Sequence, residues 1–200
     1  MQRRHFDFLL GSAGVMLAVV LIVLGVYFND RYNFAHTNVR DQLKEQKIFF
    51  PEKDALTPEE QEQPGLVKYA GQQLDDGDKA QVYANEYINL HLSEIADGKT
   101  YAELGGPLFA LQDKVDAAKE SNDPDLATLE GELAAARAER TTVLTGETLR
   151  GLLLTTYGFW TFGQEAQLGM YVSWAAAALL LLMALAGFIH AFRTPEDATI

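Results

Sequence analysis

The sequence of 200 residues contains no cysteine and only four histidines. The absence of cysteine excludes disulfide bonds and thiolate chemistry. The chain also lacks the common catalytic and nucleotide-binding motifs, namely H-E-x-x-H, G-x-S-x-G, the P-loop and G-x-G-x-x-G. We therefore expect no catalytic residues, no cofactor and no metal, and we interpret the protein as non-catalytic.

The few histidines are poorly placed for a metal site. His5 and His190 lie near the two ends of the chain, which leaves His36 and His91 in the central region. His91 and Glu94 are three residues apart and share a helical face, but a di-iron site needs two Glu-x-x-His motifs and two further glutamates. An enzyme is thus the third hypothesis, and it requires His36, His91 and a carboxylate to converge in one pocket.

Basic side chains are scarce as well. The chain has 16 Lys and Arg against 28 Asp and Glu, which gives a net charge of −12. Nucleic acids and anionic lipids attract proteins through Lys and Arg, so this balance argues against a nucleic-acid partner. The segment Asp75-Asp76-Gly77-Asp78 resembles part of a calcium loop, but it lacks the alternating ligands and the glutamate at the twelfth position, so no calcium site is predicted.

Two long apolar runs contain no Asp, Glu, Lys or Arg. Residues 8–28 would form a helix roughly 31 Å long, which matches a bilayer hydrocarbon core of about 30 Å. Residues 169–192 contain one histidine, His190, near their end. We predict a transmembrane helix at each run. The first run is longer than the apolar region of a signal peptide and no A-x-A cleavage site follows it, so we interpret it as an uncleaved anchor.

The two short tails, residues 1–7 and 193–200, predict the orientation. Arg3 and Arg4 precede the first apolar run, and Arg193 follows the second. Because basic residues stay on the cytoplasmic side, we expect both termini in the cytoplasm. The region between the runs is then extracytoplasmic and carries the whole net charge. The expected location is the plasma membrane, with the lipid bilayer as a partner.

The extracytoplasmic region, residues 29–168, is predicted to form helices joined by short turns. The first predicted helix extends to Gln46 and ends before Pro51, because a residue that precedes proline disfavours the helical conformation. The segment Thr57–Glu60 combines an N-cap, a proline and a capping glutamate, which predicts a helix start. Apolar residues then recur at helical spacing from Asp78 to Ala96.

Two later segments share a heptad pattern. The first begins with the capping box Thr100–Glu103, and Gly105-Gly106-Pro107 is expected to kink this helix or delay its start. The second follows Asp123-Pro124 and has Arg140 at the one polar core-type position. A short turn between two such helices predicts an antiparallel hairpin. The expected fold is therefore all-α, with two transmembrane helices flanking an extracytoplasmic helical-bundle domain that contains this hairpin.

Small and aromatic residues mark the candidate interaction faces. Small residues four apart in the apolar runs let helices approach closely, either each other or the helices of a partner. The aromatic segment before the second run is either a core helix of the domain or a segment in the membrane interface. The candidate residues are Gly14, Ala18, Gly169, Ser173, Ala177, Tyr157, Phe159, Trp160 and Phe162.

Four segments resemble an actinobacterial family of small membrane proteins with two transmembrane helices and an extracytoplasmic helical domain: KIFFP, VKYAGQQLDDGDKAQVYANEYINLHL, DGKTYAE and GETLRGLLLTTYGFW. The resemblance covers most of the chain from Lys47 to the second apolar run. It implies an actinobacterial source and a plasma-membrane location, and it carries over no catalytic residues.

Two functional hypotheses remain besides the enzyme. The leading one is an accessory or scaffold subunit of a larger respiratory or cell-envelope membrane complex, with other integral membrane proteins as partners. The alternative is an extracytoplasmic ligand-binding or sensor module. Such a module would act through a partner, because the predicted tails are too short for an output domain. A homo-oligomer is compatible with either hypothesis.

Overall fold

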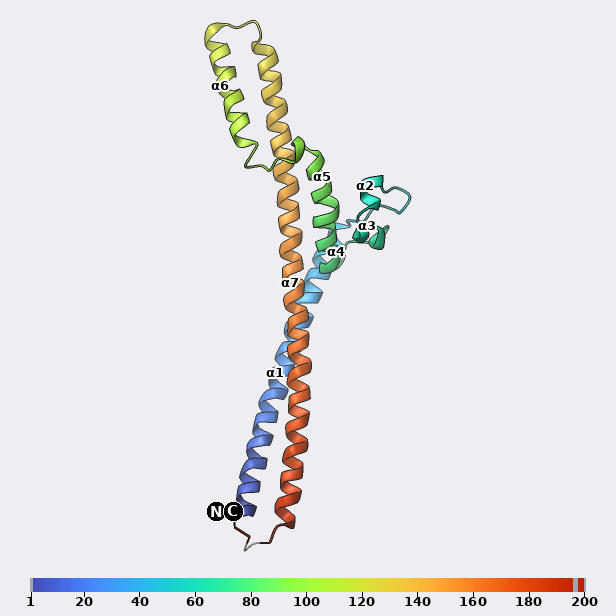
Figure 1. Cartoon of the computed structure of the whole chain (residues 1–200), viewed down its shortest axis with the longest axis vertical. Coiled ribbons are helices and arrows are strands. Elements are labelled where there is room, and N and C mark those ends of the chain that lie inside the picture. Colours follow the sequence, from blue (N-terminus) through green and yellow to red (C-terminus); the bar gives the residue numbers. More distant parts are fainter. Residues whose placement is uncertain (1, 196–197, 200) are drawn as a thin grey trace. The chain divides into compact units, whose positions relative to one another are not determined.

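The computed structural model describes residues 2–195 and 198–199, and these residues are predominantly helical (Figure 1). The all-α prediction is confirmed. Of the predicted tails, residues 1, 196, 197 and 200 lie outside the described part. The elements in chain order are α1 (Arg3–Gln46), α2 (Pro58–Gln61), α3 (Pro64–Tyr69), α4 (Gly77–Val82), η1 (Tyr83–Ile88), α5 (Asn89–Glu94), η2 (Ala96–Gly98), α6 (Gly105–Ser121) and α7 (Leu126–Arg193).

The chain divides into two compact units. The first consists of Met1–Asn38 and Trp160–Ile200, and the second of Val39–Phe159. Helices α1 and α7 each contribute to both units, because neither helix ends at the division. Both helices are also long and apolar enough to cross a membrane, as the two apolar runs predicted. In the most apolar window of each helix, only 17% of the residues are buried within the chain, so most of these apolar side chains lie on its surface.

In the first unit, α1 and α7 lie side by side along a seam that repeats every seven residues (Figure 1). This spacing keeps the same faces of two helices in contact along their length. The buried residues at this spacing are Gly11, Ala18 and Gly25 in α1 and Met170, Ala177, Ala184 and Ala191 in α7. Most of them are small, which allows the two backbones to approach closely.

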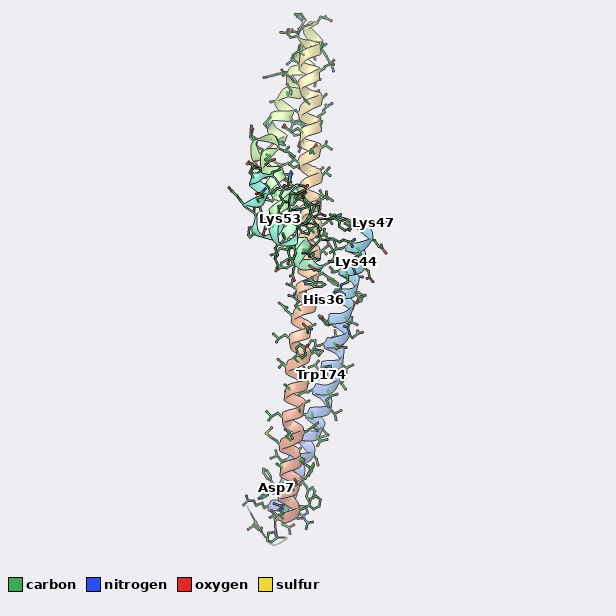
Figure 2. The ribbon with its side chains drawn as sticks, turned by 90° about the vertical axis from the view of Figure 1, so that its right-hand side faces the viewer. Asp7, His36, Lys44, Lys47, Lys53 and Trp174 are labelled. Carbon is green, nitrogen blue, oxygen red and sulfur yellow. The ribbon has the colours of Figure 1, made fainter. Side chains whose placement is uncertain are left out.

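Glycine is required where large side chains cross this seam. A Cβ atom at Gly11 would lie 2.8 Å from Cε1 of Phe188. At Gly25 it would collide with the indole of Trp174, which lies alongside α1 (Figure 2). The glycines of α1 thus provide the space that the aromatic side chains of α7 fill.

The second unit has a small core around the turn that follows α1. Helix α1 ends at Gln46, as predicted, and the chain turns through Lys47, whose φ is 54°. Phe50 is only 2% exposed, and its ring contacts Tyr69 and Tyr83 at centroid distances of 5.7 and 5.3 Å. The other fully enclosed apolar side chains here include Leu66, Leu74, Ala80 and Ala84.

The predicted helix over residues 78–96 is present as a continuous helical stretch from Gly77 to Glu94, formed by α4, η1 and α5. Asp76 caps it by accepting the N–H of Lys79 at 2.8 Å. Its middle part, η1, is a π-helical turn, which the periodicity did not predict. Such turns hold one extra residue per turn and are frequent at functional sites.

Helix α6 and the first part of α7 lie side by side in the second unit (Figure 1). The predicted capping box is formed: Thr100 N–H donates to Glu103 Oε2 at 2.8 Å, and Glu103 N–H donates to Thr100 Oγ1 at 3.3 Å. Helix α6 nevertheless begins only at Gly105, which places Pro107 in its first turn, where a proline is tolerated. Arg140 Nε donates to the carbonyl oxygen of Tyr101 at 3.2 Å, and the guanidinium carbon of Arg140 lies 3.8 Å from the centroid of the Tyr101 ring.

Candidate functional site

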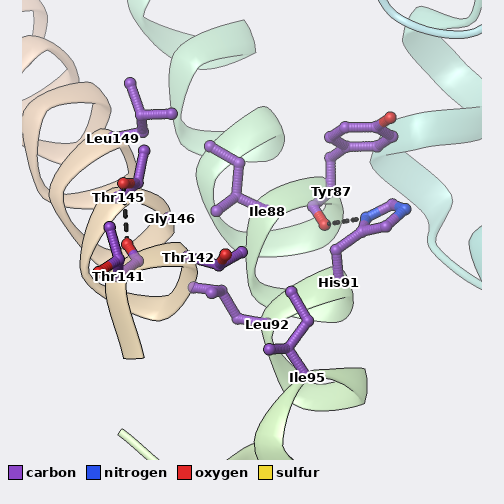
Figure 3. A pocket seen from close by; sticks show the side chains of 10 residues that line it. All are labelled: Tyr87, Ile88, His91, Leu92, Ile95, Thr141, Thr142, Thr145, Gly146 and Leu149. Atoms are coloured by element: carbon purple, nitrogen blue, oxygen red, sulfur yellow. Dashed lines mark hydrogen bonds between the residues drawn. The ribbon is translucent and has the colours of Figure 1, made fainter. Parts of the chain in front are cut away.

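A cavity of about 380 Å³ lies in the second unit between α7 and the helical stretch η1–α5 (Figure 3). This volume is in the usual range for sites that bind small molecules. The cavity is lined by Tyr87, Ile88, His91, Leu92 and Ile95 on one side and by Thr141, Thr142, Thr145, Gly146 and Leu149 on the other.

The threonine hydroxyls of the α7 wall are already engaged. Thr141, Thr142 and Thr145 each donate to the carbonyl oxygen four residues earlier in their own helix, at distances of 2.8, 3.1 and 2.9 Å. Because a hydroxyl has a single proton, these groups have no donor left for a ligand. The wall therefore offers a ligand mainly methyl and methylene groups.

The polar groups of the opposite wall are also directed elsewhere. His91 Nδ1 lies 2.8 Å from the carbonyl oxygen of Tyr87, which can only accept, so Nδ1 carries a proton. His91 Nε2 lies 3.6 Å from Oε1 of the buried Glu60. In Figure 3 the rings of Tyr87 and His91 lie on the side away from α7. Burial raises the pKa of Tyr87, so its phenol stays neutral at physiological pH.

A second cavity, of about 320 Å³, adjoins the first and shares Tyr87, Ile88 and Leu149 with it. Its remaining lining residues are Leu43, Gln46, Ile48, Tyr83, Leu152, Leu153 and Thr156. Burial, together with the nearby Tyr87 and Glu60, raises the pKa of Tyr83 to about 12. We call the two adjoining cavities the α7 cleft.

Contacts on both sides of η1 hold the cleft in place. Glu86 accepts the backbone N–H groups of Gly65 and Leu66 at 2.6 and 3.2 Å, which fastens η1 to α3. On the other side, Arg150 of α7 donates to Asn85 Oδ1 at 3.1 Å. The two helical walls also approach each other closely at Gly146 of α7 and Leu92 of α5.

That close contact depends on a glycine. A Cβ atom at Gly146 would lie 2.6 Å from Cδ2 of Leu92, so a larger residue here would require the Leu92 side chain to move. A glycine inside a helix destabilises it by roughly 1 kcal/mol relative to alanine. The close approach of the two walls therefore has an energetic cost within α7.

The predicted small-residue faces of the apolar runs contact each other within the first unit. A Cβ atom at Gly14 would lie 3.5 Å from the Cβ of Ala184, and one at Gly169 would lie 3.1 Å from the ring of Phe28. The other three members of the set, Ala18, Ser173 and Ala177, are buried. Mutual packing of the two apolar helices is present in the structure, and packing of these faces against the helices of a partner stays a prediction.

The predicted aromatic segment is part of α7 and has a buried and an exposed side. Trp160 is 6% exposed, and its ring lies over that of His36 with centroids 3.6 Å apart. Tyr157 is half-buried. Phe159 is exposed, and Phe162 is 69% exposed. An exposed phenylalanine next to the predicted second span fits a membrane interface, while Trp160 belongs to the packing between α1 and α7.

The histidines of the central region have separate surroundings. His36 contacts Tyr32 and Trp160, whereas His91 contacts Tyr87 and Glu60. Within residues 2–195 and 198–199, no group of three or more His, Asp or Glu side chains is arranged to hold a metal ion. The geometry therefore gives no support to the enzyme hypothesis.

The cleft itself was not predicted from the sequence. A local signal is the α7 segment 141–156, which is rich in threonine and leucine and in which Leu149 and Leu152 are 50% and 61% exposed. No protein family, curated protein or solved structure matches this chain. The resemblance to an actinobacterial membrane family stays a prediction, and the functional argument rests on the geometry.

Proposed function

We propose that this protein is a non-catalytic, membrane-anchored binding protein whose outer helical domain takes up an apolar ligand in the α7 cleft. The observation that carries this proposal is the pair of adjoining cavities, with volumes of about 380 and 320 Å³ and walls of apolar groups. A site of this size and lining holds a small molecule mainly through the hydrophobic effect. This proposal corresponds to the ligand-binding module that the sequence left as the alternative.

The proposed topology follows from the apolar helices and the basic tails. The two apolar segments lie within α1 and α7, and the arginines outside them place both termini in the cytoplasm by the positive-inside rule. The acidic region 29–168 is then extracytoplasmic, and α6 with the first part of α7 forms its helical hairpin. Lys119 and Glu130 support this pairing with an ion pair at 3.1 Å.

A module of this kind transmits ligand binding through a partner. Exposed apolar side chains beside the cleft provide a surface for one, because large apolar side chains in water favour association. On α7 of the second unit these side chains are Leu144 and Phe159.

A second candidate is the accessory or scaffold subunit of a larger membrane complex. It is favoured by a groove of about 270 Å³ in the first unit, between α1 and α7. Gly11, Gly14 and Gly187 contribute to its lining, and such small residues allow the helix of a partner to approach. Recovery of a stoichiometric membrane complex with a tagged chain, extracted in mild detergent, would support this candidate. Recovery of the chain alone would count against it.

The ligand proposal is tested by thiol labelling, which the cysteine-free chain makes specific to one site. The variants are Thr145→Cys, inside the cleft, and Thr148→Cys, outside it. Both positions are exposed, and both hydroxyls bond to the carbonyl four residues earlier, which makes them a matched pair. The full chain in nanodiscs is labelled with a maleimide with and without N-phenyl-1-naphthylamine, an uncharged apolar probe.

We expect the probe to slow labelling at position 145 about fivefold when its concentration is about four times its Kd, because protection scales with occupancy. Labelling at position 148 should not change. Equal rates at position 145 with and without the probe would overturn the proposal, and so would equal slowing at both positions.

A further inference from the structure

The two cavities of the α7 cleft follow one another along a single helix. Their α7 lining extends from Thr141 to Thr156, which corresponds to about 22 Å of helix axis. The two cavities share Tyr87, Ile88 and Leu149, so they adjoin one another along the helix. One leaflet of a bilayer contributes about 15 Å of hydrocarbon thickness. The cleft is therefore long enough to hold the chain of one lipid molecule.

The chemistry of the lining selects an aliphatic occupant. Branched aliphatic side chains such as Ile88, Leu92 and Leu153 dominate the walls. The hydroxyl of Thr156, like those of the other threonines, donates within its own helix, to Leu152 O at 2.9 Å. A ligand with many buried polar atoms would replace few of its hydrogen bonds to water here, whereas a hydrocarbon chain loses none.

The contact between the walls narrows the space for an occupant. An α-helix with its side chains is about 10 Å in diameter. At Gly146 the backbone of α7 lies against the side chain of Leu92, where an added Cβ would be 2.6 Å from Cδ2. A single hydrocarbon chain is thinner than a helix and suits this space better.

We propose that the α7 cleft binds one acyl chain of a membrane phospholipid. This inference rests on the proposed function, since it names the class of the apolar ligand. The bilayer is the source of the lipid, because the helix that forms one wall also contains the predicted second span. The net charge of −12 resides between the predicted spans and repels anionic head groups, so the lipid is zwitterionic.

The test uses the full chain in nanodiscs that contain a phosphatidylcholine with a photoreactive diazirine in one acyl chain. After irradiation, mass spectrometry locates the modified residues. We expect modification within the lining of the α7 cleft, at positions such as Ile88 and Leu149, in addition to the apolar spans. Modification confined to residues 8–28 and 169–192 would overturn the inference.

A filling variant distinguishes the cleft from the surface around it. Thr145→Trp should lower cleft modification about fivefold, because overfilling a packed site weakens binding. The matched control Thr148→Trp should leave it unchanged. Leu149→Glu provides a second blocking variant, since a charge disfavours an acyl chain whether or not the tryptophan is tolerated. Cleft modification that persists in both blocking variants would refute the site.

Competition and the thiol-labelling assay separate the remaining outcomes. Unlabelled phosphatidylcholine should compete better than phosphatidylglycerol, and better than a polyprenyl lipid. Stronger competition by the polyprenyl or the anionic lipid would overturn the assignment to a zwitterionic phospholipid. Protection of position 145 by N-phenyl-1-naphthylamine without lipid modification of the cleft would refute this inference and leave the proposed function standing. Failure of both assays would refute both.

Discussion

The contact between Glu86 and the start of α3 determines how firmly one wall of the cleft is held. Oε2 of Glu86 accepts the N–H groups of Gly65 at 2.6 Å and of Leu66 at 3.2 Å. Hydrogen bonds to a charged acceptor contribute about 1.5–3 kcal/mol each. Glu86 belongs to η1, whose next residues Tyr87 and Ile88 line the cleft. Loss of this contact should therefore loosen the wall as well as destabilise α3.

Substitution of Glu86 should lower the free energy of unfolding, and the loss should be larger when the new side chain has no hydrogen-bond acceptor. We expect Glu86→Gln to lower it by about 1–2 kcal/mol, because the amide keeps one acceptor but loses the charge. Glu86→Ala should lower it by about 2–4 kcal/mol, since two part-buried N–H donors lose their acceptor. The control is Glu94→Ala, at an exposed position of the same helical stretch, where the change should stay within about 0.5 kcal/mol.

Hydrogen exchange of the full chain in nanodiscs, followed by mass spectrometry, measures these effects by segment. Local opening exposes the amides of α3 without global unfolding, so the two processes can be distinguished. We expect Glu86→Ala to accelerate exchange most strongly in Pro64–Tyr69 and next in η1. If Glu86→Ala exchanges no faster than Glu94→Ala in α3, then the two hydrogen bonds do not stabilise this part of the domain and the reasoning is wrong.

Three further predictions concern span packing, pH and the core. The double variant Gly14→Cys/Ala184→Cys should form a disulfide on oxidation, because the Cβ separation of 3.5 Å lies in the disulfide range. Reducing and non-reducing gels detect the bond as a difference in mobility, and the two single variants are the controls. No mobility difference in the double variant would contradict the packing. Tyr83 has its pKa raised to about 12 in the folded chain, so its contribution to stability is complete below pH 10 and is lost between pH 10 and about 12. Because Tyr83 is partly solvated, the expected loss is about 1 kcal/mol, and Tyr83→Phe should abolish it in denaturation measured across this pH range. Leu66→Ala should lower the free energy of unfolding by about 2–5 kcal/mol, whereas Leu144→Ala, at an exposed position, should lower it by much less. Denaturant titrations measure both losses, and equal losses would show that Leu66 is not in a packed core.

The parts of the fold predicted from the sequence are those with local signals. The end of α1 at Gln46 follows from the proline at position 51, and the start of α2 follows from the capping box at Thr57. The late start of α6 follows from Pro107, which is tolerated only in the first turn of a helix. In each case residues within about five positions determine the outcome, so a single sequence contains the necessary information.

The features that were not predicted depend on contacts between distant residues. Helix α3 begins at Pro64 and was not predicted; Glu86, 21 residues further along the chain, accepts the backbone N–H of Gly65 and stabilises its start. The π-helical turn η1 occurs where Tyr83 packs on Phe50 and Tyr87. Neither contact can be recognised from the hydrophobic periodicity of the sequence.

The candidate interaction faces show the same limit of prediction from a single sequence. The spacing of Gly14 and Ala18 predicted a close helix contact, but it did not identify the partner of that contact. In the structure the partner is the other apolar helix of the same chain. Surfaces for other molecules must therefore be sought among side chains that remain exposed after this packing, and the α7 cleft has such side chains at its edge.

The residues of the α7 wall are poorly explained by stability alone. The segment Thr141–Gly146 places three threonines and a glycine within six residues of a helix, and these four line the cavity. Each is less favourable in a helix than alanine, by up to about 1 kcal/mol for the glycine. Larger aliphatic side chains at the threonine positions would both favour the helix and fill the space. The threonine and glycine side chains are small, and the threonine hydroxyls donate within α7. This wall therefore suits a cleft that another molecule fills.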